Sequence, residues 1–183
     1  MQDLLVRTRA DFERLPDEGR WEVAEGRAIL VPPPRVPHQK ITAKLNRLLE
    51  DAIEKIGYGS VILGVTVFIP RPPKSYGEVQ SRIPDLVVAR REPQEYFEAG
   101  EPPDLVIEIL STPRGNVERT EKLDDYALAG IGEYWIVNPF PHAVEIYRLV
   151  DGVYRDPEVI SAGTLSPRAF PGLEIEITQI WPT

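Results

Sequence analysis

The stretch PPDLVIEIL, residues 102–110, has the composition of a buried central β-strand that carries one charged residue. Its apolar residues lie on both sides of the pleat, which is typical of a strand covered on both faces. Glu108 lies among them. Burial removes water from a carboxylate at a large free-energy cost, so the stretch predicts a partner for Glu108 that offsets this cost.

A second apolar stretch, RIPDLVVAR at residues 82–90, places Asp85 directly before three apolar residues. Neighbouring strands of a sheet lie about 5 Å apart, so Asp85 and Glu108 could converge on one point if their strands pair. Two such carboxylates repel each other unless one is protonated or a cation lies between them. A divalent metal such as Mg²⁺ accepts carboxylate and carbonyl oxygens, and the backbone carbonyl of Ile109 offers one more ligand.

A structural interpretation of these acids remains open. Asp85 would then only end a turn after Pro84, and Glu108 would pair with a buried arginine or lysine. This is the simpler interpretation of either acid taken alone, whereas the pair leaves the metal site and the structural role evenly balanced.

The segment that follows Glu108 predicts a helix over residues 116–130, closed by Gly130. Spacings of three and four residues place Arg119, Lys122 and Tyr126 on one face of this helix. Lys122 borders the apolar stripe of the helix, so its long side chain could reach across the sheet. The alternative is a solvated lysine that pairs with Glu118.

The remaining segments predict a mixed α/β (α+β) fold with helices flanking a central sheet. No glycine-rich nucleotide-binding motif follows a strand. One expected helix begins after Thr8, the N-cap of a Thr8–Asp11 capping box, and ends before Pro16; a second covers residues 39–56 and is closed by Gly57. The expected strands form an N-terminal hairpin around Glu25-Gly26 and cover residues 59–70, 82–90, 104–110, 133–138, 143–150 and 152–160.

Composition limits the possible functions. The 183 residues suit a single domain, 1–183, and the absence of cysteine excludes disulfides, thiolate metal sites and cysteine nucleophiles. No apolar run is long enough to span a bilayer and no signal peptide is seen, so we expect a cytoplasmic protein. The net charge of −8 argues mildly against a nucleic-acid partner, although metal-binding acids and a separate basic patch are compatible with it.

Two histidines are too few for a multi-histidine zinc site, and no serine lies in the context of a catalytic triad. His38 precedes the helix predicted over 39–56, where a polar residue that starts the helix is the simpler interpretation. Glu22 lies in a strand-like segment and indicates little by itself. His142 receives no role.

The strings RWEVAEGRAILVPPP, PHQKI, RIPDLVVA, PPDLVIEILSTP, EKLDDYALAGIGEYWIVNP and FPGLEIEI occur in this order. In this respect the chain resembles the Uma-two family of restriction-endonuclease-like proteins, within the PD-(D/E)xK nuclease superfamily, from about Thr8 to Ile180. The resemblance implies a restriction-endonuclease-like fold with a central mixed sheet and flanking helices. The E-x-K motif would need lysine at position 110, where this chain has Leu110, and Lys122 on the following helix is the candidate replacement.

The resemblance also implies metal-assisted hydrolysis of phosphodiester bonds in DNA, with Mg²⁺ or Mn²⁺. Lys122 would orient water or stabilise transition-state charge, and His38 would contact phosphate or assist proton transfer. The metal ligands implied are Asp85, Glu108, Glu22 and the Ile109 carbonyl. Basic residues expected to attract a polyanion, if they are not simply a solvated loop, are Arg71, Lys74 and Arg82.

Two other functions remain open. The missing lysine and the acidic balance fit a fold relative without activity, acting as a nucleic-acid-binding or oligomeric module. Hydrolysis of a small phosphoester would use the same residues as the nuclease reaction. The apolar strands between residues 133 and 160 would need cover at an edge, so we expect a homo-oligomer, a dimer or larger.

Overall fold

The computed structural model describes residues 4–70, 74–91, 101–112 and 116–182. The chain forms two compact units. The first unit comprises Met1–Pro33 and Thr66–Ile83, and the second comprises Pro34–Val65 and Pro84–Thr183. Segments of the two units alternate along the chain, and the single domain expected over residues 1–183 stays a prediction.

The first unit is a four-stranded sheet with strand order β2-β1-β5-β4 and one short helix. Helix α1 begins after Thr8. The Thr8 hydroxyl accepts the Asp11 N–H, and the Asp11 carboxylate accepts the Thr8 N–H, so the predicted capping box is present. The predicted hairpin is also present, with Glu25 and Gly26 at φ 51° and 74° in its turn. The elements are α1 Arg9–Glu13, β1 Arg20–Ala24, β2 Arg27–Val31, β4 Val67–Phe68, the 3-10 helix η1 Lys74–Tyr76 and β5 Ser81–Arg82.

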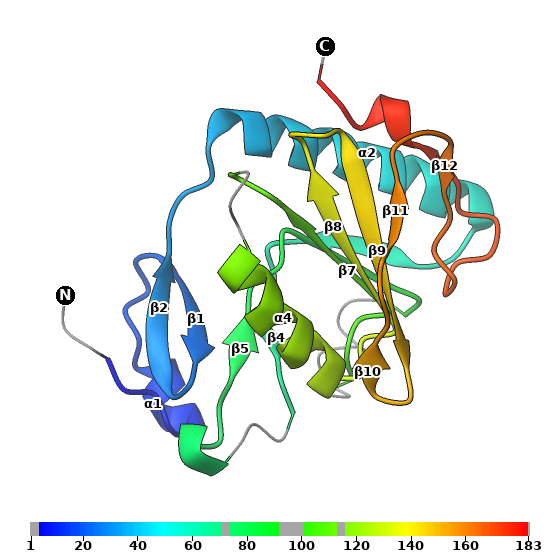
Figure 1. Cartoon of the computed structure of the whole chain (residues 1–183). Coiled ribbons are helices and arrows are strands. Elements are labelled where there is room, and N and C mark those ends of the chain that lie inside the picture. Colours follow the sequence, from blue (N-terminus) through cyan, green and yellow to red (C-terminus); the bar gives the residue numbers. More distant parts are fainter. Residues whose placement is uncertain (1–3, 71–73, 92–100, 113–115, 183) are drawn as a thin grey trace. The chain divides into compact units, whose positions relative to one another are not determined.

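The second unit contains the larger sheet, in strand order β10-β9-β8-β7-β6-β3, with β11 paired to β9 (Figure 1). Among the described strands of this sheet, only β7 and β8 run parallel, so the sheet is mixed, as predicted. Its strands are β3 Ser60–Leu63, β6 Leu86–Ala89, β7 Leu105–Ile109, β8 Glu133–Asn138, β9 Ala143–Val150, β10 Val153–Tyr154 and β11 Glu158–Ile160. A small pair, β12 Thr164–Leu165 with β13 Ile175–Glu176, and the 3-10 helix η2 Ile177–Gln179 complete it.

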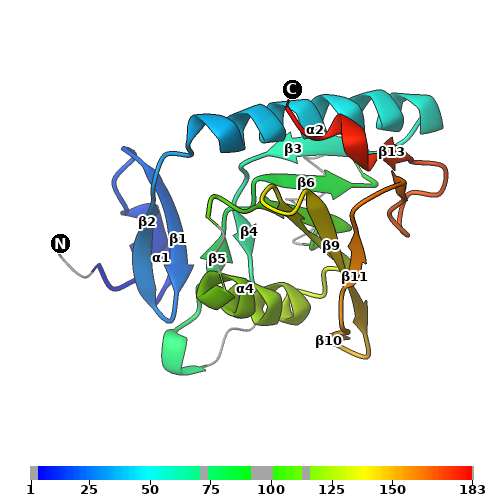
Figure 2. The same ribbon diagram turned by 45° about the horizontal axis from the view of Figure 1, so that its top comes forward.

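Two helices cover opposite faces of this sheet (Figure 2). Helix α2, Val36–Ile56, packs its apolar stripe onto the face formed by residues such as Ile107 and Trp135, which makes the main core. It begins three residues earlier than the periodicity predicts, with Pro37 in its first turn, and ends at Gly57 with φ 77°. Helix α4, Asn116–Leu128, lies on the other face. Within the described residues, no helix is both long and apolar enough to cross a membrane.

Two stretches predicted as single strands are each divided between the units. Residues 59–70 form β3 and β4, which belong to different sheets, with Gly64 between them at φ 56°. Residues 82–90 form the end of β5 and all of β6, separated by Pro84. Proline has no N–H to donate to a ladder, so it ends strand pairing here and leaves Asp85 at the entrance to β6. The predicted strand over 152–160 is also divided, into β10 and β11, but both of these strands pair with β9 in the second unit.

Candidate active site

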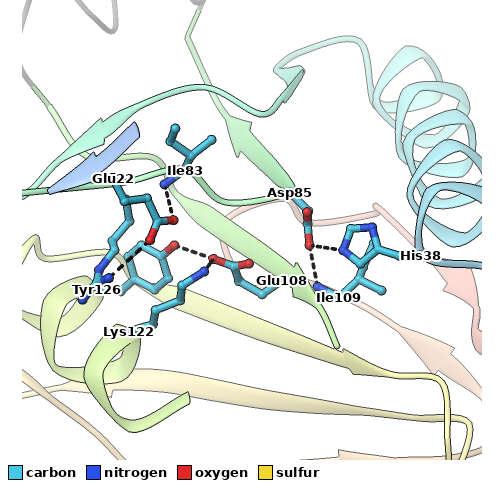
Figure 3. Close-up of polar contacts among 9 residues, drawn as sticks. Glu22, His38, Ile83, Asp85, Glu108, Ile109, Lys122 and Tyr126 are labelled. Carbon is cyan, nitrogen blue, oxygen red and sulfur yellow. Dashed lines mark hydrogen bonds and ion pairs between the residues drawn. The ribbon is translucent and has the colours of Figure 1, made fainter. Parts of the chain in front are cut away.

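Asp85 lies where the ladder between β6 and β7 ends (Figure 3). The last pair of that ladder is Leu86 with Ile107, so the same register continued sets Glu108 opposite Asp85 and Ile109 opposite Pro84. The Asp85 Oδ2 atom accepts the Ile109 N–H at 2.8 Å and also contacts His38 Nε2 at 3.0 Å. Pro84 thus ends the strand, and the Asp85 carboxylate accepts the Ile109 N–H in place of a backbone carbonyl.

Glu108 projects from β7 toward helix α4, and its side chain is 12% exposed. Its Oε1 atom accepts two hydrogen bonds at 2.8 Å, one from Lys122 Nζ and one from the Tyr126 hydroxyl. Lys122 is 8% exposed, so it is not the solvated lysine of the alternative interpretation. Two expectations are met by this one contact. Lys122 reaches from helix α4 to the sheet, and Glu108 pairs with a buried lysine.

The two acids interact electrostatically. The pKa of Glu108 is raised to about 7, because burial, the largest cause, and the neighbouring Asp85 charge outweigh the lowering effect of Lys122 and Tyr126. Asp85 and Glu108 therefore lie within range of each other, as expected for acids at the ends of adjacent strands. Without a further cation, Glu108 is only partly ionised at neutral pH.

Each carboxylate has one oxygen free of internal hydrogen bonds within the described part of the chain. Asp85 uses only Oδ2 and Glu108 only Oε1, which leaves Asp85 Oδ1 and Glu108 Oε2 open. In the continued register the Ile109 carbonyl has no ladder donor opposite it, because Pro84 lacks an N–H. Two carboxylate oxygens and a carbonyl suit Mg²⁺, which is often held by one or two carboxylates together with water.

The donor set is small. Across the described residues, no group of three or more acidic or histidine side chains is arranged to hold a metal. The residues present therefore fit a metal whose remaining coordination positions are filled by water or by a substrate phosphate, and a fully protein-coordinated ion does not fit them.

His38 reaches Asp85 from the first turns of helix α2, and it is buried. Its Nδ1 atom lies 3.4 Å from the Thr42 hydroxyl, one helical turn further on. Burial lowers the pKa of His38, but the hydrogen bond to Asp85 and the charges of Asp85 and Glu108 outweigh burial, so its pKa is raised. His38 is thus more than a polar residue at a helix start, because both ring nitrogens have partners inside the site.

Glu22 belongs to the first unit, where it is buried on β1. Its Oε1 atom accepts the Ile83 N–H at 2.9 Å, and its Oε2 atom lies 3.3 Å from Arg82. The interpretation of Arg82 as a solvated, polyanion-attracting residue is wrong, because β5 lies between β1 and β4 and buries this side chain to 5% exposure. Arg71, which shared that prediction, lies outside the described residues, as does the side chain of Lys74.

Sequence reasoning placed Tyr126 on the helix face with Lys122 but gave it no role. Its hydroxyl completes the Glu108 site, and its ring packs edge-on against Tyr134 of β8 with centroids 5.0 Å apart. The signal was the four-residue spacing from Lys122, which places both donors over the same carboxylate.

Comparisons with known proteins identify the family and the fold of the chain. The chain matches the Uma2 family, described as "Putative restriction endonuclease", over residues 9–178. A solved structure from Anabaena variabilis ATCC 29413, titled a putative nuclease belonging to DUF820, superposes with a TM-score of 0.71 at 22% identity, covering 99% of this chain and 98% of that one. No curated protein matches the chain.

The solved structure establishes a shared fold, which confirms the predicted restriction-endonuclease-like architecture. The family match extends across both units and supports a nuclease function in general. It also confirms the family that the order of motifs indicated. The chain belongs to the Uma2 family of restriction-endonuclease-like proteins.

Proposed function

We propose that this protein is a metal-dependent endonuclease that hydrolyses phosphodiester bonds of DNA with Mg²⁺ or Mn²⁺. The observation that carries the proposal is the arrangement of Asp85 and Glu108. Each carboxylate is fixed through one oxygen by internal donors and leaves its other oxygen open, while the buried ammonium of Lys122 lies 2.8 Å from Glu108.

The two open oxygens and the Ile109 carbonyl are the proposed metal ligands. Glu22 remains a candidate ligand by resemblance only. When bound, the metal would polarise a phosphoryl oxygen and lower the pKa of a coordinated water. The Ile109 N–H, Lys122 and Tyr126 serve to hold the carboxylates in place before any metal arrives, so that ligand positions are fixed by the sheet and helix α4.

Lys122 supplies positive charge where negative charge develops on the phosphate during hydrolysis. A cation held in a buried site acts more strongly than one in water, because little solvent screens it. His38 has both ring nitrogens engaged, by Asp85 and near Thr42, so we assign it to positioning Asp85. Contact of His38 with phosphate would require it to give up one of these partners.

The test combines Mn²⁺ titration calorimetry with cleavage of supercoiled plasmid DNA. We expect the wild-type chain to bind Mn²⁺ and to cleave, and Glu108→Gln to lose both, because the amide keeps the shape of the side chain but not its charge. Glu145→Gln is the matched control, since Glu145 is a half-buried acid on β9 of the same sheet. Equal Mn²⁺ binding by wild type and Glu108→Gln would refute the proposed metal site.

A second function has one specific observation in its favour. Leu110 occupies the position at which E-x-K nucleases carry lysine. A chain without activity would bind nucleic acid or assemble with further copies through the same fold. Absence of both Mn²⁺ binding at millimolar metal and DNA cleavage would favour this function, and light scattering would then determine whether the protein is an oligomer.

A further inference from the structure

Acidic residues are absent from one long stretch of this acidic chain. The chain carries a net charge of −8, yet it has no aspartate or glutamate between Glu25 and Glu50. The first half of helix α2 lies in this stretch. Its basic residues Lys40, Lys44 and Arg47 are spaced by four and three residues, so they form one stripe along the helix.

The charges of this stripe are largely uncompensated. Lys40 is exposed and makes no ion pair within the described residues. Lys44 donates to the backbone carbonyl of Trp181 at 2.8 Å, and this neutral acceptor leaves its charge in place. Arg47 lies 3.9 Å from Asp51, and both side chains are more than half exposed, so water screens the pair and weakens it.

Aromatic rings adjoin the basic stripe. The ring of His142, in the turn between β8 and β9, stacks on Trp181 with centroids 4.8 Å apart and planes 13° apart. Phe140 in the same turn is 50% exposed. The Trp181 carbonyl accepts the hydrogen bond from Lys44, so the His142–Trp181 pair adjoins the stripe.

This surface lies at the end of the sheet that carries the candidate active site. The turn with the aromatic rings follows β8, and Val137 near the end of that strand pairs with Ile109, which donates to Asp85. On helix α2, Lys44 lies six residues beyond His38, about 9 Å along the helix axis. All of these residues belong to the second unit.

We infer that this surface, formed by Lys40, Lys44, Arg47, Phe140, His142 and Trp181, binds the phosphate backbone of duplex DNA and presents it to the site. The inference rests on the proposed function. Lysine and arginine contacts to phosphates supply sequence-independent affinity by releasing counterions. The exposed rings add van der Waals contact with the sugar-phosphate backbone. An acidic chain thereby confines its attraction for a polyanion to the neighbourhood of the site.

The test compares two double variants by fluorescence anisotropy on labelled duplex DNA, in EDTA and over a range of salt. Lys40→Gln/Arg47→Gln removes two charges from the surface. Lys55→Gln/Arg155→Gln is the matched control, because Lys55 is an exposed lysine at the far end of the same helix and Arg155 forms an exposed pair with Asp151 at 3.6 Å.

We expect the surface variant to lose about 60-fold in affinity at ~0.1 M salt and its salt slope to fall by about 2, because each lost phosphate contact contributes about 0.9 to the slope. The control should retain the wild-type slope. Equal slopes for the two variants would overturn the inference. A loss of affinity for duplex RNA with none for duplex DNA would also overturn it.

Failure of the inference and of the proposed function can be told apart. If the wild-type chain does not cleave DNA but the surface variant loses affinity as expected, the nuclease assignment fails and the DNA-binding surface stands. If the wild-type chain cleaves DNA, and the surface variant matches the control in both binding and KM, the surface fails and the nuclease assignment stands.

Discussion

From the raised pKa of Glu108 we predict that this residue lowers the stability of the metal-free protein as pH rises from 5 to 8. Burial is the largest cause of this shift, and the Asp85 charge adds to it. In the unfolded chain Glu108 ionises near 4.5, whereas in the folded chain it ionises near 7. Between these values the folded state holds the proton more tightly, so protonated Glu108 stabilises it, and this contribution is lost as pH passes 7.

The size of the effect follows from the pKa difference. A shift from 4.5 to about 7 corresponds to about 3 kcal/mol, at 1.36 kcal/mol for each pKa unit. Most of this falls between pH 5 and pH 8, where we expect Glu108 to account for a decrease of about 2 to 3 kcal/mol in the free energy of unfolding. His38, with its own raised pKa, adds a decrease of the same sign.

The assay is urea denaturation in EDTA at pH 5 and pH 8, for wild type, Glu108→Gln and the Glu145→Gln control. Glu108→Gln removes the titrating group, so its stability should fall less over this range than that of wild type. The control keeps Glu108 and should follow wild type. If Glu108→Gln and wild type lose the same stability between the two pH values, then the site does not hold Glu108 in the way described.

Three further predictions concern stability. Arg82→Met leaves buried Glu22 without its 3.3 Å ion pair and should lower the free energy of unfolding by about 3 kcal/mol, and Glu22→Gln in the same chain should restore part of it. Tyr126→Phe removes the hydroxyl that donates to Glu108 and should lower the free energy of unfolding, measured by urea denaturation, by about 1 to 2 kcal/mol. Gly77→Ala should lower the Tm more than Gly57→Ala. Both glycines have positive φ, but only at Gly77 would the new Cβ lie 2.6 Å from a backbone oxygen, that of Arg7. Equal decreases in Tm would contradict this.

Local sequence determined the elements whose signals are short in range. The capping box at Thr8, the turn at Glu25-Gly26 and the end of helix α2 at Gly57 each depend on residues a few positions apart, and each is present in the structure. The acid at position 108 was visible for the same reason, since a charge is conspicuous within a short run of apolar residues. The order of such motifs was enough to identify the family.

Long-range contacts decided the rest. No local pattern shows that Pro84 separates strands of two different sheets, because this depends on which strands pair. Nor does local sequence show that Arg82 is buried beside Glu22 on another strand, or that Lys122 points inward to Glu108. Local sequence predicts that a charged side chain is solvated, because the counter-ion that allows its burial lies far away in the sequence. Burial of such pairs is a property of the folded sheet, and no single segment contains it.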